Sequence, residues 1–192
     1  MKHLIIYAHP NPKSFNHAIL ETLQEVYKAK GHSLTVRDLY AEGFNPVLAP
    51  SDFEAMGKGS LPQDILREQR YVKDADFITF VYPIWWAGFP AVLKGYFDRV
   101  FLKGFAYDFD AKGIVGLLKG KKAAIINTTG TPEPVYNGSG MLKSLNQTSE
   151  QGIFGFCGVE VVAHRYFGAV PSVTPEQRKD MLAQIRALAE KF

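Results

Sequence analysis

The stretch FITFVYPIWWAGFPAVLKGYFDRVF, residues 77–101, decides the fold. It opens with FITFVY, a short run of β-branched and aromatic residues that is typical of a strand buried on both faces. Pro83 lacks a backbone donor and ends the strand, and Pro90 suits the first turn of a helix. The apolar positions of that helix recur at helical spacing; they are Leu93, Phe97, Val100 and Phe101. The stretch therefore predicts a strand, a loop and a helix in succession.

Both tryptophans of the chain, Trp85 and Trp86, lie in the loop after this strand. In open α/β sheets, the carboxyl ends of the strands form the edge at which ligands bind. Large aromatic side chains are also common core residues, so the pair has two interpretations. It is either part of the core or a wall for a planar ligand.

Strand and helix patterns alternate along the rest of the chain. Further strands are predicted at 3–8, 34–39, 123–127 and 159–164. Helices are predicted from the Ser14 N-cap to about Gly31 and at 63–73, 140–156 and 174–192. Residues 40–62 are predicted to be irregular, with one helical turn at 52–56, and residues 103–122 to form a long loop over the sheet edge.

This alternation predicts one α/β domain over residues 1–192. Its core is a doubly wound, five-stranded parallel sheet in the order 2-1-3-4-5, with helices on both faces. A closed eight-fold barrel needs a longer chain.

Composition excludes several classes of protein. The chain has 192 residues, of which 46% are hydrophobic and 21% charged, and a net charge of +3 without a basic block, so nucleic-acid binding is not indicated. The apolar runs are too short for a membrane span. A single cysteine, Cys157, excludes an internal disulfide and suits a reducing compartment. We therefore expect a cytoplasmic protein without an integral membrane segment.

Three loops are predicted at the carboxyl ends of neighbouring strands, at residues 9–16, 83–89 and 128–136. The first precedes a helix N-terminus, which favours phosphate, although Ser14 serves equally well as a simple helix cap. The second is aromatic. The third has small hydroxyl residues and Gly130, which lets a ligand approach the backbone. Together the three loops predict a binding slot of the size of flavin mononucleotide.

Seven stretches follow one another along nearly the whole chain: LIIYAHPNPKSFNHA, DLYAEGFNP, DILREQ, PIWWAGFPAVLKGYFDRVF, KGFAYDF, NTTG and FCGVEV. In this order they resemble the flavodoxin-like NAD(P)H:quinone oxidoreductases of the DT-diaphorase type and their shorter bacterial relatives. The resemblance implies a two-electron, ping-pong reduction of quinones, and of nitro or azo compounds, by NADH or NADPH. It also implies FAD as the cofactor, with FMN as the alternative, and a homodimer with its sites at the subunit interface.

The resemblance also implies roles for individual residues. Those on the phosphate or adenylate side of the flavin are His9, Ser14, Phe15 and Asn16. Those that border the isoalloxazine and supply backbone amides are Pro83, Ile84, Trp85 and Trp86. The opposite rim consists of Thr128, Thr129, Gly130 and Thr131. The substrate side is walled by Tyr107, Phe109 and Trp86.

Tyr136 is the predicted catalytic residue, because the resemblance places its hydroxyl at the flavin carbonyl region. Animal members carry a histidine a few residues after this tyrosine, whereas residues 137–142 contain none. Either Tyr136 acts alone, or backbone amides and water carry the proton. The remaining histidines have no metal-ligand spacing, and no metal site is predicted. They are interpreted as a surface residue, His32, and as structural residues, His3, His17 and His164.

A second class of function retains the same flavin site. Some bacterial relatives are ancillary, regulatory subunits of potassium-efflux systems, and this alternative stays open on the sequence. An electron-carrying flavodoxin is disfavoured, because such carriers are acidic and have a different, Ser- and Thr-rich loop, whereas this chain is basic.

Overall fold

The computed structural model describes residues 1–192. Its elements in chain order are β1 (Lys2–Tyr7), α1 (Phe15–Ala29), β2 (Ser33–Asp38), α2 (Pro50–Gly57), α3 (Gln63–Asp74), β3 (Phe77–Pro83), α4 (Ala91–Val100), β4 (Tyr107–Asp110), β5 (Gly113–Gly116), β6 (Lys122–Thr128), α5 (Glu133–Gly138), α6 (Met141–Asn146), the π-helix η1 (Gln147–Gly155), β7 (Glu160–Phe167) and α7 (Pro175–Ala189). No helix combines the length and the apolar character that crossing a membrane requires.

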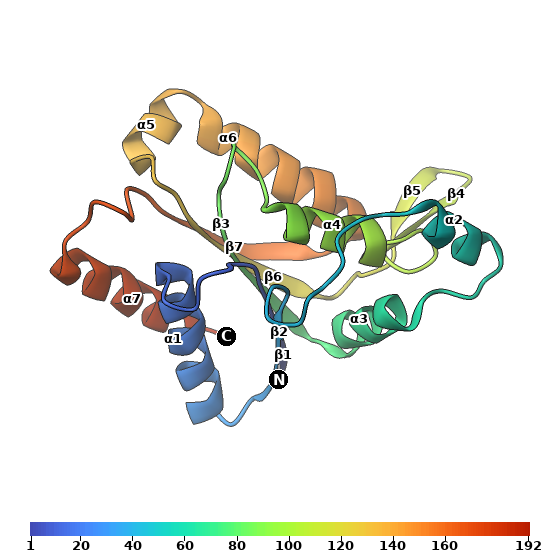
Figure 1. Ribbon diagram of the computed structural model, residues 1–192, viewed down its shortest axis with the longest axis horizontal. Coiled ribbons are helices and arrows are strands. Elements are labelled where there is room, and N and C mark those ends of the chain that lie inside the picture. Colours follow the sequence, from blue (N-terminus) through green and yellow to red (C-terminus); the bar gives the residue numbers. More distant parts are fainter.

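The main sheet has five parallel strands in the order β2-β1-β3-β6-β7. This confirms the predicted doubly wound order, because β6 and β7 are the fourth and fifth strands of this sheet. Helices α1 and α7 cover one face, and α3, α4 and η1 cover the other (Figure 1). The central strand β3 is buried along its whole length, as its continuous apolar run predicts.

Three segments differ from the sequence prediction. Residues 103–122 are not simply a loop, because β4 and β5 pair as an antiparallel hairpin within them. The strands are only four residues long, and their short pattern is hard to separate from a glycine-rich loop. Between residues 40 and 62, α2 has eight residues instead of one helical turn. The predicted loop 128–136 is helical from Glu133 onward, because the short helix α5 begins there.

Arg99 of α4 attaches the segment around α2 to the body of the domain. Its buried guanidinium donates to both carboxylate oxygens of Asp52 at 3.0 Å and to Asp64 Oδ2 at 2.8 Å. The backbone of Pro46 packs directly on α4, where a Cβ at Gly95 would lie 2.1 Å from the Pro46 carbonyl oxygen. Gly95 is therefore required for this close approach.

Candidate cofactor-binding site

A cavity of about 350 Å³ opens at the carboxyl ends of β1, β3 and β6. This is the edge of the sheet where the strand order reverses and where α/β proteins bind ligands. Four segments line the cavity: the loop before α1, the loop after β3, the end of β6, and the loop that joins β7 to α7. Its lining residues are His9, Asn11, Lys13, Ser14, Phe15, Asn16, Pro83, Ile84, Trp85, Thr128, Thr129, Gly130, Val170, Pro171 and Arg178.

The charge of the cavity favours an anion. Lys13 and Arg178 line it, whereas no carboxylate does. Helix α1 begins in the cavity wall, where Ser14 accepts a hydrogen bond from the backbone N–H of His17 as the N-cap. A helix N-terminus beside two cations provides both the dipole and the donors that phosphate requires.

His9 lies in the cavity wall as a neutral group. Its Nδ1 accepts a hydrogen bond from the backbone N–H of Asn11 at 3.0 Å, and burial lowers the pKa of the ring. The imidazole lies 5.7 Å from the ring of Trp85. His9 therefore supports the aromatic wall and holds the turn of its loop.

Asn16 presents an unpaired acceptor. Its side chain is buried, and its Nδ2 donates to Thr128 Oγ1 at 2.7 Å, which joins α1 to the end of β6. Its Oδ1 is fully enclosed and has no hydrogen-bond partner. A buried acceptor without a donor is costly. At the wall of a cavity, such an acceptor suits a ligand group that donates an N–H or O–H. The ribityl chain of a flavin carries such hydroxyl groups, and its phosphate matches Lys13 and Arg178.

The loop after β3 has an unusual backbone. Trp86 and Ala87 adopt positive φ angles of 50° and 55°, so two consecutive residues with side chains are left-handed. The N–H of Ile84 donates to Thr128 O at 2.8 Å and that of Trp85 to Gly88 O at 3.2 Å. These two amides are thus engaged within the chain, and the amides of Trp86 and Ala87 are the loop's candidates for a ligand.

The structure brings together ten of the twelve predicted cofactor-binding residues in this cavity. The residues that do not line it are Trp86, Thr131, Tyr136, Tyr107 and Phe109. Trp86 projects fully into solvent. Thr131 lies beyond the rim, where its carbonyl accepts from Thr129 Oγ1 at 2.6 Å. Tyr136 lies half-buried on α5, and Tyr107 and Phe109 lie on β4.

Sequence reasoning missed Arg178 and the loop that contains Val170 and Pro171. Arg178 lies in the first turns of α7, and its Nη2 donates to Val170 O at 3.0 Å. The signal was available in principle, because the loop after the fifth strand opens at the same sheet edge as the three loops that were predicted. An isolated arginine in a helix carries no sequence signature of phosphate binding.

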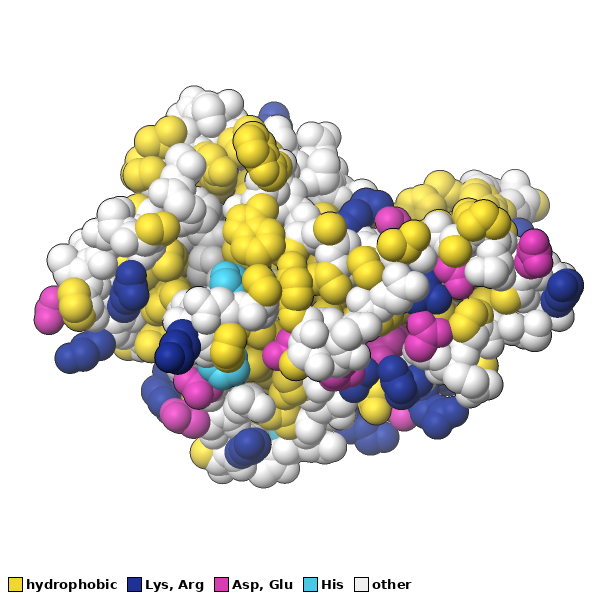
Figure 2. Space-filling model, in the orientation of Figure 1, with side chains coloured by type: hydrophobic (Ala, Val, Ile, Leu, Met, Phe, Trp, Pro, Cys, Tyr) yellow, Lys and Arg dark blue, Asp and Glu magenta, His cyan; other side chains and the backbone are white.

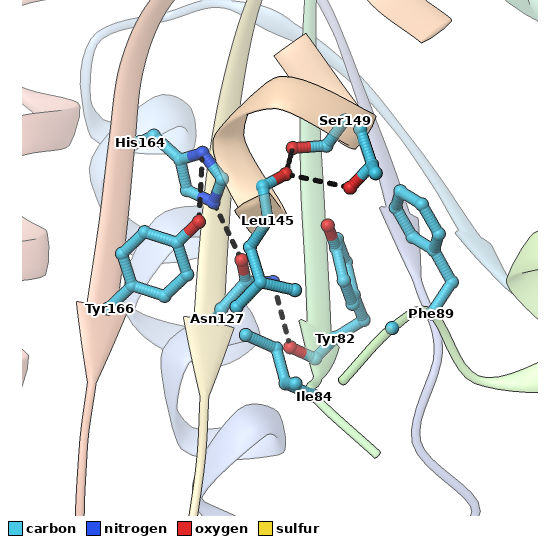
Figure 3. Close-up of a pocket in the computed structure, with 10 residues that line it drawn as sticks. Tyr82, Ile84, Phe89, Asn127, Leu145, Ser149, His164 and Tyr166 are labelled. Carbon is cyan, nitrogen blue, oxygen red and sulfur yellow. Dashed lines mark hydrogen bonds between the residues drawn. The ribbon is translucent and has the colours of Figure 1, made fainter. Parts of the chain in front are cut away.

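A second, much smaller cavity of about 20 Å³ lies behind the first, and Ile84 lines both. Figure 3 shows its polar side chains from β6 and β7, with the first turn of the π-helix above them. His164 contacts Asn127 through Nε2 at 2.7 Å and Glu150 through Nδ1 at 2.8 Å. The ring of Tyr166 stacks on His164 at 4.3 Å. His164, which the sequence suggests is merely structural, thus lies in a connected polar cluster.

Comparison with known proteins shows which family and which enzymes the whole chain resembles. A family model described as a flavodoxin-like fold matches residues 1–190. An uncharacterized NAD(P)H oxidoreductase of Haemophilus influenzae is 42% identical over 95% of this chain and 91% of its own. A mouse ribosyldihydronicotinamide dehydrogenase [quinone] is 35% identical over 95% of this chain and 87% of its own. The solved NAD(P)H:quinone oxidoreductase of Methanothermobacter marburgensis superposes with a TM-score of 0.88, at 29% identity, over 99% of this chain and 96% of its own.

Proposed function

Because this chain belongs to the flavodoxin-like fold family, we propose that it is a flavin-dependent NAD(P)H:quinone oxidoreductase. The observation that carries the proposal is the cationic cavity at the switch point of the sheet, with the unpaired Asn16 Oδ1 in its wall. Relatives that match along nearly the whole chain have names of the same class. Quinones are the proposed acceptors, and nitro and azo compounds are further candidates.

The bound flavin supplies the two-electron chemistry that couples a nicotinamide to a quinone. The residues of this chain bind and orient it. Lys13, Arg178 and the N-terminus of α1 would hold its phosphate, and Asn16 Oδ1 would accept from a ribityl hydroxyl. Trp85 would border the ring system. Tyr107, Phe109 and Trp86 remain the proposed substrate wall, and Tyr136 the proposed proton donor.

Titration of the purified protein with FAD and with FMN tests the proposal, followed by NADH and NADPH oxidation in the presence of a benzoquinone. Tight binding of one flavin per chain and sustained turnover are expected. Extraction and mass spectrometry of any bound flavin distinguish FAD, the cofactor the resemblance implies, from FMN. Protein that leaves the fluorescence of both flavins unchanged would rule out the proposed function, whereas binding without turnover would point to a regulatory or carrier protein.

Replacing Asn16 by Leu is expected to weaken flavin binding about two- to tenfold. The change removes the acceptor from the cavity wall and leaves the Thr128 hydroxyl without its donor, and one such hydrogen bond contributes about 0.5–1.5 kcal/mol. Asn16→Gln keeps a neutral amide that can both accept and donate, and it should bind flavin more tightly than the Leu variant. Flavin fluorescence quenching measures both affinities, and thermal unfolding of the apo variants serves as the control for folding. Equal affinities for wild type and Asn16→Leu would remove Asn16 from the site.

We also propose that the protein is a cytoplasmic homodimer. Figure 2 shows hydrophobic side chains in the middle of one face of the molecule and over the β4–β5 hairpin. Several large apolar side chains are exposed there and around the candidate cavity, including Trp86, Trp85, Phe109 and Ile114. Exposed apolar side chains in such number favour a protein partner, and a second copy of the chain related by a twofold axis would cover them on both molecules.

The dimer is expected to weaken when this surface becomes charged. Ile114→Lys places a cation on the exposed face of β5, away from the cavity lining, so flavin binding within one chain should persist while association is lost. Light scattering at micromolar concentration measures the mass of both proteins. Glu160→Gln, at the exposed start of β7, is the matched control, because it also changes the charge by +1 without changing apolar surface. A wild-type monomer with full activity would contradict the assembly.

A further inference from the structure

The cluster around His164 lies directly behind the candidate flavin site. Asn127 is the residue before Thr128, and Tyr82 is the residue before Pro83, so each lies one position inward from the lining of the large cavity. The side chain of Asn127 joins the two strands, because its Nδ2 donates to the Tyr82 carbonyl at 3.2 Å (Figure 3). Any change in this amide therefore acts on both β3 and β6 at the point where they reach the site.

The partners of Asn127 determine its orientation and the tautomer of His164. The Tyr82 carbonyl can only accept a hydrogen bond, so the NH₂ group of Asn127 (Nδ2) must face it. The carbonyl oxygen Oδ1 of the same amide must then face the imidazole. His164 Nε2, at 2.7 Å from that oxygen, therefore carries a proton. If Nε2 lost its proton, two acceptors would face each other, or the amide would rotate and place Oδ1 against the Tyr82 carbonyl.

The other ring nitrogen requires a second proton. Nδ1 lies 2.8 Å from Glu150 Oε1, and an unprotonated nitrogen would face a carboxylate that can also only accept. One proton must lie between them, on the imidazole or on the carboxyl group. Burial lowers the pKa of His164 more than the Glu150 carboxylate raises it. The 2.8 Å contact between two acceptors is therefore what requires the second proton, and either position of that proton leaves the pair without net charge.

No other group near the pair competes for this proton at neutral pH. The titratable neighbours are Tyr166 on β7, Tyr82 on β3 and, further out, Glu133 on α5. Burial raises the pKa of both tyrosines well above the ordinary value. The hydroxyl of Tyr166 also lies 3.5 Å from His164 Nδ1, but its proton is donated to Asn146 Oδ1 at 2.6 Å, at the end of α6.

We propose that His164 and Glu150 hold one shared proton and act together as a positioning unit for the flavin site, by fixing the amide of Asn127 against the Tyr82 carbonyl. The unit also joins the sheet to the π-helix, whose register places Glu150 on the imidazole. A π-helical segment is rare and is often found at functional sites. The positioning role rests on the proposed flavin site, whereas the shared proton does not.

Nuclear magnetic resonance of the apo protein tests the shared proton without any flavin. Histidine is labelled with ¹⁵N, and the His164 signals are identified by their loss in His164→Leu. At pH 7, a proton bonded to Nε2 and a second, strongly downfield proton at the Nδ1–Glu150 contact are expected. Glu150→Gln should abolish the downfield signal and retain the proton on Nε2. A wild-type His164 without a proton on Nε2, or a downfield signal that persists in Glu150→Gln, would overturn the proposal.

Variants that separate stability from positioning test the role in the site. His164→Leu leaves Glu150 without its partner and Asn127 Oδ1 without its donor, so both stability and flavin affinity should fall. Adding Glu150→Leu removes the carboxylate that has lost its partner, and the melting temperature should recover in part, because Asn127 Oδ1 stays without a donor. Flavin affinity of the double variant should stay about three- to tenfold below wild type, because Asn127 still lacks its donor. The exposed Glu160→Gln on the same strand is the control and should behave as wild type.

The outcomes distinguish this inference from the proposed function. If flavin affinity recovers together with the melting temperature in the double variant, His164 is only structural and the positioning role is refuted. If wild-type protein binds no flavin, the proposed function and the positioning role both fail, while the NMR signals of the apo protein still decide whether the proton is shared.

Discussion

Replacing Arg37 by Met is expected to lower the free energy of unfolding by about 3–5 kcal/mol. Arg37 of β2 forms a two-pronged ion pair with Glu68 of α3, with Nε at 3.0 Å from Oε2 and Nη2 at 2.6 Å from Oε1. The carboxylate side chain of Glu68 is 0% exposed, so water cannot replace the lost partner. The contacts that remain are weaker, with Arg67 Nε at 3.6 Å and the Tyr96 hydroxyl at 3.4 Å. A buried charge that loses its main partner is among the costliest defects that a single substitution can create.

The pair itself adds little stability compared with an apolar replacement. The double variant Arg37→Met/Glu68→Leu removes both charges and should recover most of the loss. Arg186→Met is the matched control, because both Arg186 and its partner Glu25 are exposed, and it should cost less than about 1 kcal/mol. Urea unfolding at pH 7 measures all four proteins. A single variant within 1 kcal/mol of wild type, or a double variant as unstable as the single one, would contradict this account.

Replacing Tyr136 by Phe is expected to slow NAD(P)H oxidation about ten- to a hundredfold and to leave flavin affinity nearly unchanged. The change deletes one hydroxyl and retains the ring, and a hydrogen bond to a charged group contributes about 1.5–3 kcal/mol. Tyr136 follows the cavity rim on α5, and it does not line the cavity itself. A catalytic role for Tyr136 therefore requires that α5 moves toward the bound flavin or that the partner subunit completes the site.

Stopped-flow reduction by NADH and NADPH measures this effect directly. Tyr71→Phe is the matched control, because Tyr71 lines a separate cavity at the opposite edge of the sheet. A Tyr136→Phe rate within twofold of wild type would mean that Tyr136 only packs against its loop. Backbone amides of the loop after β3 would then have to donate the hydrogen bond.

Periodicity predicted the elements that bury the most apolar surface. The strand at residues 77–82 and the helix after Pro90 were predicted correctly, because their apolar side chains contribute much of the larger core cluster. The strand order was predicted from the alternation of strands and helices. The β4–β5 hairpin was missed because four-residue strands with exposed ends produce little pattern. Helix α5 was missed for a similar reason, since none of its residues is buried.

The candidate site was predictable where its residues lie in loops that follow strands. Asn16 and Thr128 were identified separately, and the structure joins them through a hydrogen bond across 112 positions of sequence. His164 could not be assigned a role, because its partners Asn127 and Glu150 lie 37 and 14 positions away and one of them depends on the register of a π-helix. Arg178 reaches the cavity only through the placement of α7.

The attachment by Arg99 also identifies where this chain can become longer. One guanidinium holds Asp52 before the exposed stretch 57–60 and Asp64 after it, so both ends of that stretch are fixed to α4. The entropic free-energy cost of closing a loop between fixed ends grows slowly, by about 0.6 kcal/mol for each doubling of the loop length. Additional residues inserted at 58–60 would therefore leave the sheet and the cavity undisturbed. The stretch is a natural point at which a related or engineered protein could gain a new surface element.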